Sequence, residues 1–66
     1  MQIGYSEDTL RFNICKQFAE IDSELRWLRY YYRQKDNDCM EDCVRNIQDS
    51  LTVILENLEN LKGETL

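Results

Sequence analysis

The sequence Asp36-Asn37-Asp38 divides the chain into two long segments in which apolar residues recur at regular intervals. Asn and Asp favour turns and helix N-caps, because their side chains hydrogen-bond nearby backbone N–H groups. Asp38, with Glu41 three residues later, resembles a capping box at the start of a helix. Residues 36–38 are therefore predicted to be the turn at which the chain reverses its direction.

The segment before this turn carries a heptad pattern. Its apolar residues occupy a (Phe18, Leu25, Tyr32) and d (Ile14, Ile21, Leu28), in alternating steps of 4 and 3 residues. This is the period of an α-helix and not of a strand. Ser6 is a good N-cap, because its hydroxyl can accept a hydrogen bond from the first turn. The pattern predicts a helix over about residues 7–35.

The segment after the turn repeats the pattern. Its apolar residues occupy a (Val44, Leu51, Leu58) and d (Met40, Ile47, Ile54, Leu61). Gly63 follows Lys62 at the place where a glycine often ends a helix in the left-handed conformation. The pattern predicts a second helix over about residues 39–62.

Two heptad helices joined by about three polar residues must fold back on each other, so residues 1–66 are predicted to be one all-α antiparallel hairpin. Further apolar residues widen the face beyond an a/d stripe: Leu10, Cys15, Tyr31, Cys43 and Leu55. A single hairpin would leave these flanking apolar residues exposed to water. We therefore expect two hairpins to pair as a homodimeric four-helix bundle, and the alternative is a hairpin that docks on a different protein.

The chain resembles the Rop family of plasmid copy-control hairpins in its length and in its two heptad helices. The resemblance implies a dimeric bundle of the same architecture. It extends to no functional motif that can be matched residue by residue, so it implies nothing about RNA binding.

Charge is distributed unevenly along the chain. The formal net charge is −5, yet residues 25–35 hold four basic residues and no acidic one. An acidic chain is a poor non-specific ligand for nucleic acid, because phosphates repel it.

This basic stretch also holds the single Trp and three of the four Tyr residues. Trp, Tyr and Arg are enriched among residues that dominate protein binding. The predicted partner-binding residues, here called the patch, are Arg26, Trp27, Arg29, Tyr30, Tyr31 and Arg33. Alternatively, Trp27 and Tyr30 have a packing role and not a binding role. They would then pack on a dimer partner or on Ile3 and Tyr5 of the same chain.

The predicted function is a small, non-enzymatic interaction module, an inhibitor or regulator that binds a target protein through the patch. One alternative is a Rop-like nucleic-acid regulator that uses the patch arginines with Lys35. Another is an acidic mimic of nucleic acid that blocks a DNA- or RNA-binding protein. The chain has no His and no Gly-rich phosphate loop, so no catalytic residues or cofactors are predicted.

The remaining sequence features have ordinary structural explanations. Cys15, Cys39 and Cys43 are predicted to be reduced thiols without metal, because they are odd in number and follow no secretory signal. Carboxylate pairs such as Glu20 with Glu24 indicate a solvated acidic face. Without a signal segment or a membrane span, the protein is expected in the cytoplasm.

Overall fold

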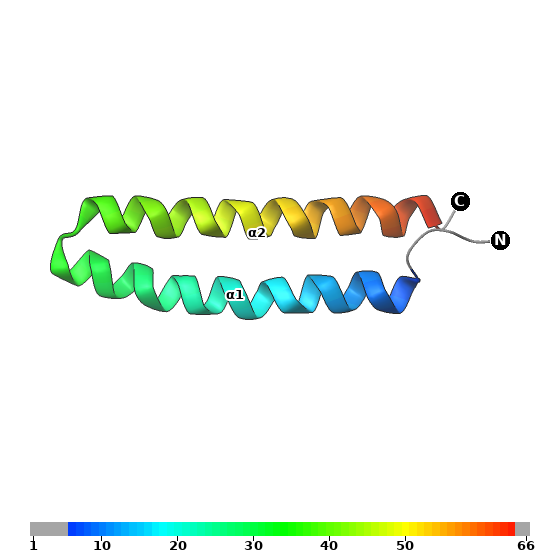
Figure 1. Cartoon of the computed structure of the whole chain (residues 1–66), viewed down its shortest axis with the longest axis horizontal. Coiled ribbons are helices and arrows are strands. Elements are labelled where there is room, and N and C mark those ends of the chain that lie inside the picture. The colour runs from blue at the N-terminus through cyan, green and yellow to red at the C-terminus, as the bar shows by residue number, and fades with distance from the viewer. Residues whose placement is uncertain (1–5, 65–66) are drawn as a thin grey trace.

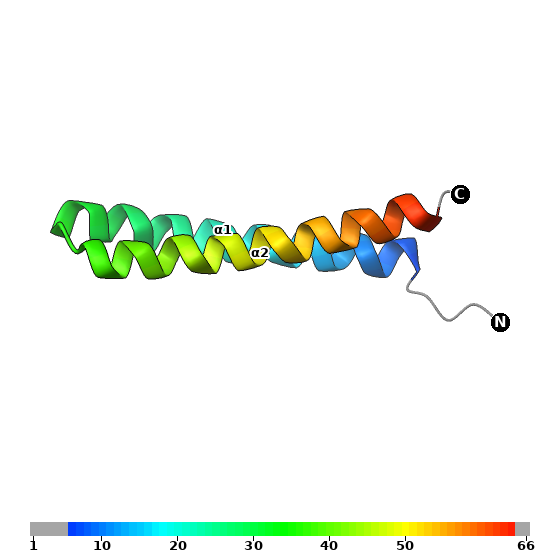
Figure 2. The same ribbon diagram turned by 90° about the horizontal axis from the view of Figure 1, so that it is seen from above.

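The computed structural model describes residues 6–64 and shows two helices folded as an antiparallel hairpin (Figure 1). Helix α1 spans Glu7–Gln34 and helix α2 spans Asn37–Glu64, each with 28 residues. Seen from above, the helices cross at a shallow angle and stay side by side along their length (Figure 2). The predicted all-helical hairpin is confirmed.

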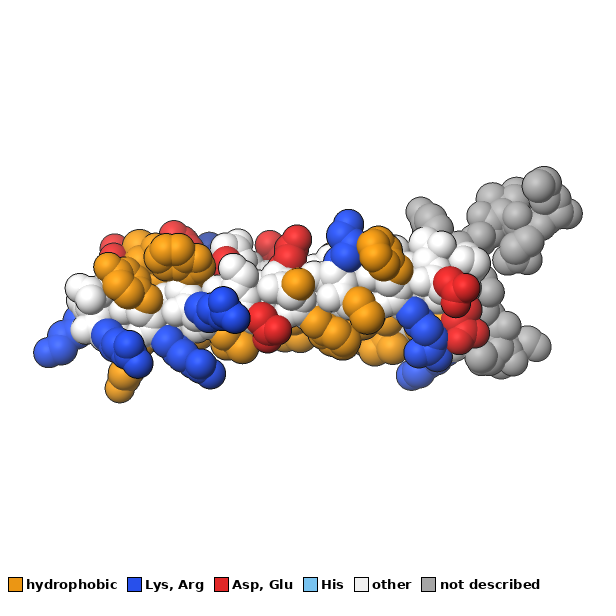
Figure 3. Space-filling model, turned by 90° about the horizontal axis from the view of Figure 1, so that it is seen from below, with side chains coloured by type: hydrophobic (Ala, Val, Ile, Leu, Met, Phe, Trp, Pro, Cys, Tyr) orange, Lys and Arg blue, Asp and Glu red, His pale blue; other side chains and the backbone are white. Residues whose placement is uncertain are grey.

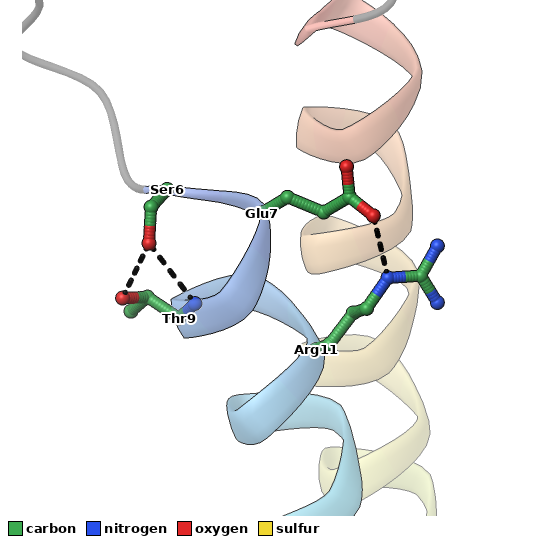
Figure 4. A network of polar contacts seen from close by, with 4 residues as sticks. All are labelled: Ser6, Glu7, Thr9 and Arg11. Atoms are coloured by element: carbon green, nitrogen blue, oxygen red, sulfur yellow. Dashed lines mark hydrogen bonds and ion pairs between the residues drawn. The ribbon is translucent and has the colours of Figure 1, made fainter.

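The start of α1 is capped as predicted. The Ser6 hydroxyl oxygen accepts a hydrogen bond from the Thr9 backbone N–H at 3.2 Å and lies 3.0 Å from the Thr9 hydroxyl (Figure 4). Glu7 pairs with Arg11 one turn later at 2.9 Å. Both pairs are exposed, and an exposed ion pair contributes at most about 1 kcal/mol.

The turn is tighter than predicted. Lys35 adopts the left-handed conformation (φ 58°, ψ 33°). The N–H groups of Lys35 and Asp36 bond back to the carbonyl oxygens of Tyr32 (3.2 Å) and Tyr31 (3.0 Å). These bonds satisfy carbonyl groups at the end of α1 that would otherwise lack partners.

The cap of α2 differs from the prediction. Asp36 accepts the Cys39 N–H through its carboxylate at 3.1 Å and the Met40 N–H through its carbonyl at 3.0 Å. The predicted N-cap, Asp38, instead lies in the first turn of α2, where its charge favours the helix dipole. The reason is that Lys35 completes the reversal with one left-handed residue, which brings Asp36 directly to the start of α2.

The end of α2 also differs. The helix continues through Gly63 to Glu64, and no described glycine has a positive φ, so Gly63 is not the predicted helix-ending residue. The space around Gly63 is open, with nothing within 4 Å of where a Cβ would lie.

The two helices contact each other through the d row and the neighbouring g row, not through a and d. The most buried residues are Leu10 at g of α1 and a row of g residues in α2: Cys43, Ser50 and Asn57. By contrast, Phe18 and Tyr32 at a are 53% and 70% exposed. Small side chains at g of α2 let the helix axes approach closely, whereas large aromatic side chains at a of α1 would hold them apart.

Polar side chains connect the helices across this seam. The Asn13 amide donates to the Asn57 amide oxygen at 3.4 Å, and the Asn46 amide donates to the Glu24 carboxylate at 3.1 Å. Asn57 also donates to the Val53 carbonyl oxygen at 2.7 Å. Among the side chains of residues 6–63, no polar atom is both fully sealed from solvent and unpaired.

Candidate protein-binding site

The three aromatic residues of the patch form one cluster near the turn end of α1. Trp27 stacks on Tyr31 with ring centroids 5.9 Å apart and an interplanar angle of 25°. Tyr30 meets both rings edge-on, at 5.9 Å from Trp27 and 5.4 Å from Tyr31. This follows from their spacing, since residues three and four apart are neighbours on a helix. Trp27 and Tyr30 remain half exposed, so the cluster presents aromatic surface to solvent.

The arginines of the patch lie beside this cluster. Arg26, Arg29 and Arg33 are exposed, and none forms an ion pair with another residue of the described range 6–64. Viewed from the α1 side, Lys and Arg side chains gather at the turn end next to exposed hydrophobic side chains (Figure 3). The predicted patch residues therefore share one end of α1. The alternative in which Trp27 and Tyr30 pack on Ile3 and Tyr5 involves two residues that lie outside the described range.

A small groove opens where the aromatic cluster meets α2. Its volume is about 250 Å³, and its wall on α1 is formed by Glu24, Trp27 and Tyr31. Its wall on α2 is formed by Cys39, Asp42, Cys43 and Asn46. The aromatic surface of the patch is thus bordered by two carboxylates, Glu24 of α1 and Asp42 of α2.

The two thiols and the tyrosine hydroxyl of this groove are held in their neutral forms. Burial, followed by repulsion from the Glu24 carboxylate, raises the pKa of the Cys43 thiol. A hydrogen bond from the Cys39 thiol to Asp36 raises the pKa of Cys39. Desolvation, followed by the nearby thiols, raises the pKa of the Tyr31 hydroxyl. At neutral pH the two thiols are therefore weak nucleophiles, because the thiolate is the reactive form.

A second surface covers the other side of the hairpin. This open face consists of apolar side chains at a and e that are 41–70% exposed: Phe18, Tyr32, Val44, Leu51, Leu55 and Leu58. Exposed apolar side chains that lie together on one face are typical of a surface that contacts another molecule.

Two kinds of feature were looked for among the described residues: clusters of metal-ligating side chains and helices that could span a membrane. Within residues 6–63 no three His, Cys, Asp or Glu side chains are arranged to hold a metal ion. No helix in the same range has an apolar stretch long enough to cross a bilayer. The three cysteines are free thiols, of which Cys15 is exposed and Cys43 is buried.

The sequence pattern locates the aromatic cluster but not the groove beside it. Heptad reasoning places the seam at a and d, which makes Glu24, Asp42 and Asn46 look like unrelated surface residues. The relevant signal is the row Cys43, Ser50 and Asn57, whose small side chains recur every seven residues beside the apolar d row.

No family model, curated protein or solved structure matches the chain, so its function has to be inferred from these surfaces.

Proposed function

We propose that this chain is a non-enzymatic interaction module that binds a target protein and thereby inhibits or regulates it. The proposed contact residues are the patch: Arg26, Trp27, Arg29, Tyr30, Tyr31 and Arg33. The observation that carries the proposal is the Trp27–Tyr30–Tyr31 ring cluster, in which Trp27 and Tyr30 are half exposed. Rigid aromatic area of this kind gives binding energy at a low entropic cost, which is why it recurs at binding hot spots.

The same proposal includes a homodimeric four-helix bundle, formed by two copies that cover each other's open face. Each helix of such a bundle touches two neighbours, one on either side of its core-facing a and d residues. In the hairpin, the d/g side is already used by the other helix. The a/e side, with Phe18, Leu51 and Leu55, is exposed and apolar. Covering it with a second copy would bury surface that an isolated hairpin leaves in water.

A protein target is favoured over nucleic acid by the charges. The chain carries 13 acidic and 8 basic residues, so phosphates are repelled by most of its surface. Three reduced thiols suit a cytoplasmic setting, which is also part of the proposal.

The test is an affinity capture that compares the wild-type protein with Trp27→Ala and Tyr30→Ala. Truncating an aromatic anchor at a binding hot spot costs about 2 kcal/mol, or about thirtyfold in affinity. We expect a specific target to be retained by the wild type and lost by both variants. Because both side chains are half exposed, the melting temperatures should change little.

The outcomes separate three explanations. Loss of binding in variants that stay folded supports the patch. Loss of stability and assembly in step with binding shows that the aromatic residues are part of a packed core. Undiminished capture by both folded variants shows that the contact surface lies elsewhere.

A further inference from the structure

The groove beside the aromatic cluster has a neighbour on the same side of the hairpin. A second cavity of about 540 Å³ lies toward the middle of the hairpin, between Gln17 and Glu20 of α1 and Asp49 and Val53 of α2. The Asn46–Glu24 hydrogen bond joins the helices where the two cavities meet. Both cavities share Glu24 and Asn46 in their linings. Together they form what is here called the outer groove.

Every residue that lines the outer groove occupies a c, f or g position of the heptad. These positions lie on the side of each helix that is turned away from a and e. The outer groove and the open face are therefore on opposite sides of the hairpin. A second copy that covers the open face leaves the outer groove accessible, so the two surfaces can be used at the same time.

The lining of the outer groove carries charge of one sign. It includes four carboxylates and no Lys or Arg: Glu20, Glu24, Asp42 and Asp49. The patch arginines are absent from the lining, because they occupy b and e positions on the other side of the aromatic cluster. A cation in the groove would therefore meet four acidic groups without competition from a basic side chain of the lining.

The floor of the groove holds a hydroxyl without a hydrogen-bond partner. Ser50 is only 6% exposed, and its hydroxyl makes no hydrogen bond within residues 6–64. Since no polar atom in that range is both sealed and unpaired, this hydroxyl must reach the groove that Ser50 lines. It is available to a donor or acceptor that enters from outside.

The aromatic end of the groove suits a cationic side chain. Trp27 and Tyr31 form its stacked aromatic wall, and Asp42 and Glu24 lie in the same lining. Aromatic faces attract Arg and Lys through cation–π contacts, and Trp is the strongest of them. An arginine in this position could stack on a ring while its guanidinium pairs with a carboxylate.

We propose that the outer groove binds a basic polypeptide segment of the protein partner, with one Arg or Lys side chain against Trp27 and Tyr31. The inference rests on the proposed function, because it takes the partner to be a protein, and it names the chemistry of the segment that is recognised. The carboxylates pair with basic side chains along the segment, and the Ser50 hydroxyl offers a hydrogen bond to its backbone. An acidic segment or a nucleic acid is repelled from this groove.

The test uses a fluorescein-labelled peptide of alternating Arg and Gly residues, with an alternating Glu and Gly peptide as control, and reads binding by fluorescence anisotropy. The wild type should bind the basic peptide and not the acidic one. Glu20→Gln with Asp42→Asn removes two groove charges and should weaken binding about two- to tenfold. Asp22→Asn with Glu56→Gln removes the same charge outside the groove and should leave affinity within about twofold.

The aromatic wall is tested by Trp27→Leu, which should weaken binding about two- to fivefold. The matched control is Phe12→Leu, an exposed aromatic residue outside the groove, which should have no effect on affinity. If Trp27→Leu lowers the helical signal, Trp27→Phe is used in its place, because it keeps an aromatic ring at the same contact.

Equal losses in the two charge-neutralised variants would show that only bulk attraction to an acidic protein is measured, and would overturn the proposal. So would failure of the wild type to bind the basic peptide. The proposed function fails in a different way. If folded Trp27→Ala and Tyr30→Ala capture the target undiminished, the patch is not the contact surface, whatever the peptide does.

Discussion

At the scale of single residues, two adjacent residues between the helices do most to define the turn. Lys35 takes the left-handed conformation that an L-residue adopts at a modest cost. Asp36 then caps α2, and the N–H of Cys39 that bonds to its carboxylate lowers the pKa of Asp36. One residue thus stops the first helix and the next starts the second.

Asp36→Ala should therefore destabilise the hairpin by about 1 kcal/mol, whereas Asp38→Ala should cost much less. Thermal melts followed by circular dichroism measure the difference, and about 1 kcal/mol shifts the melting temperature of so small a protein by about 4–8 °C. Equal shifts in the two variants would indicate that the cap is not at Asp36.

The Asp36 cap should also make the stability of the hairpin depend on pH. Because the folded-state pKa of Asp36 is lowered, its contribution is present above the pKa of the unfolded chain and is lost as the pH falls below about 4. Asp36→Asn keeps a capping oxygen without the titration. The stability of the wild type relative to Asp36→Asn should therefore decrease as the solution is acidified.

At the scale of the elements, the helices have two apolar sides and use only one of them within the hairpin. The seam follows the g row, where Ser50 is 6% and Cys43 is 5% exposed. Leu51, the residue after Ser50, is 51% exposed at a. Side-chain volume at g therefore decides how closely α1 and α2 approach.

Ser50→Leu should force the helices apart and destabilise the hairpin by about 1–3 kcal/mol, the usual cost of overpacking. Thr52→Leu adds a side chain of the same kind at an exposed position two residues away and should be nearly neutral. Chemical denaturation of both variants provides the comparison. If Ser50→Leu proves as stable as Thr52→Leu, the helices do not meet along the g row.

At the scale of the whole molecule, the hairpin is long, thin and incompletely covered. The Cα atoms of the chain extend over 53 × 15 × 14 Å, so no described residue is far from the surface. Only Leu10 and Cys43 are buried apolar residues among those described. Since hydrophobic burial is the main favourable term in folding, an isolated hairpin of this kind has little to stabilise it.

Sedimentation equilibrium at micromolar concentration should accordingly give about twice the chain mass of 8.0 kDa. Leu51→Asp should abolish folding and assembly together, because an unpaired charge buried between two copies costs several kcal/mol. Thr52→Asp is the control, since Thr52 lies at b, outside the open face. In a monomer Leu51 stays half exposed, so a Leu51→Asp variant that melts like the wild type would contradict the dimer.

The sequence by itself determined the two helices, the reversal between them and the aromatic cluster. Each of these depends on residues within a few positions of one another: a period of 3.5 residues, a polar break, and aromatic residues three and four apart. The tertiary structure decided which side of each helix faces the other. A heptad stripe with apolar flanks can be packed from either side, and the choice of d/g over a/d depends on side-chain volumes contributed by both helices.

That choice also created the outer groove and the open face. Asp42 and Glu24 line one groove because the register of the hairpin places Asn46 opposite Glu24, 22 residues earlier in the chain. The same rotation turns Phe18 and Leu51 outward. Contacts between distant segments depend on helix rotation and register, and local propensity does not constrain either of them.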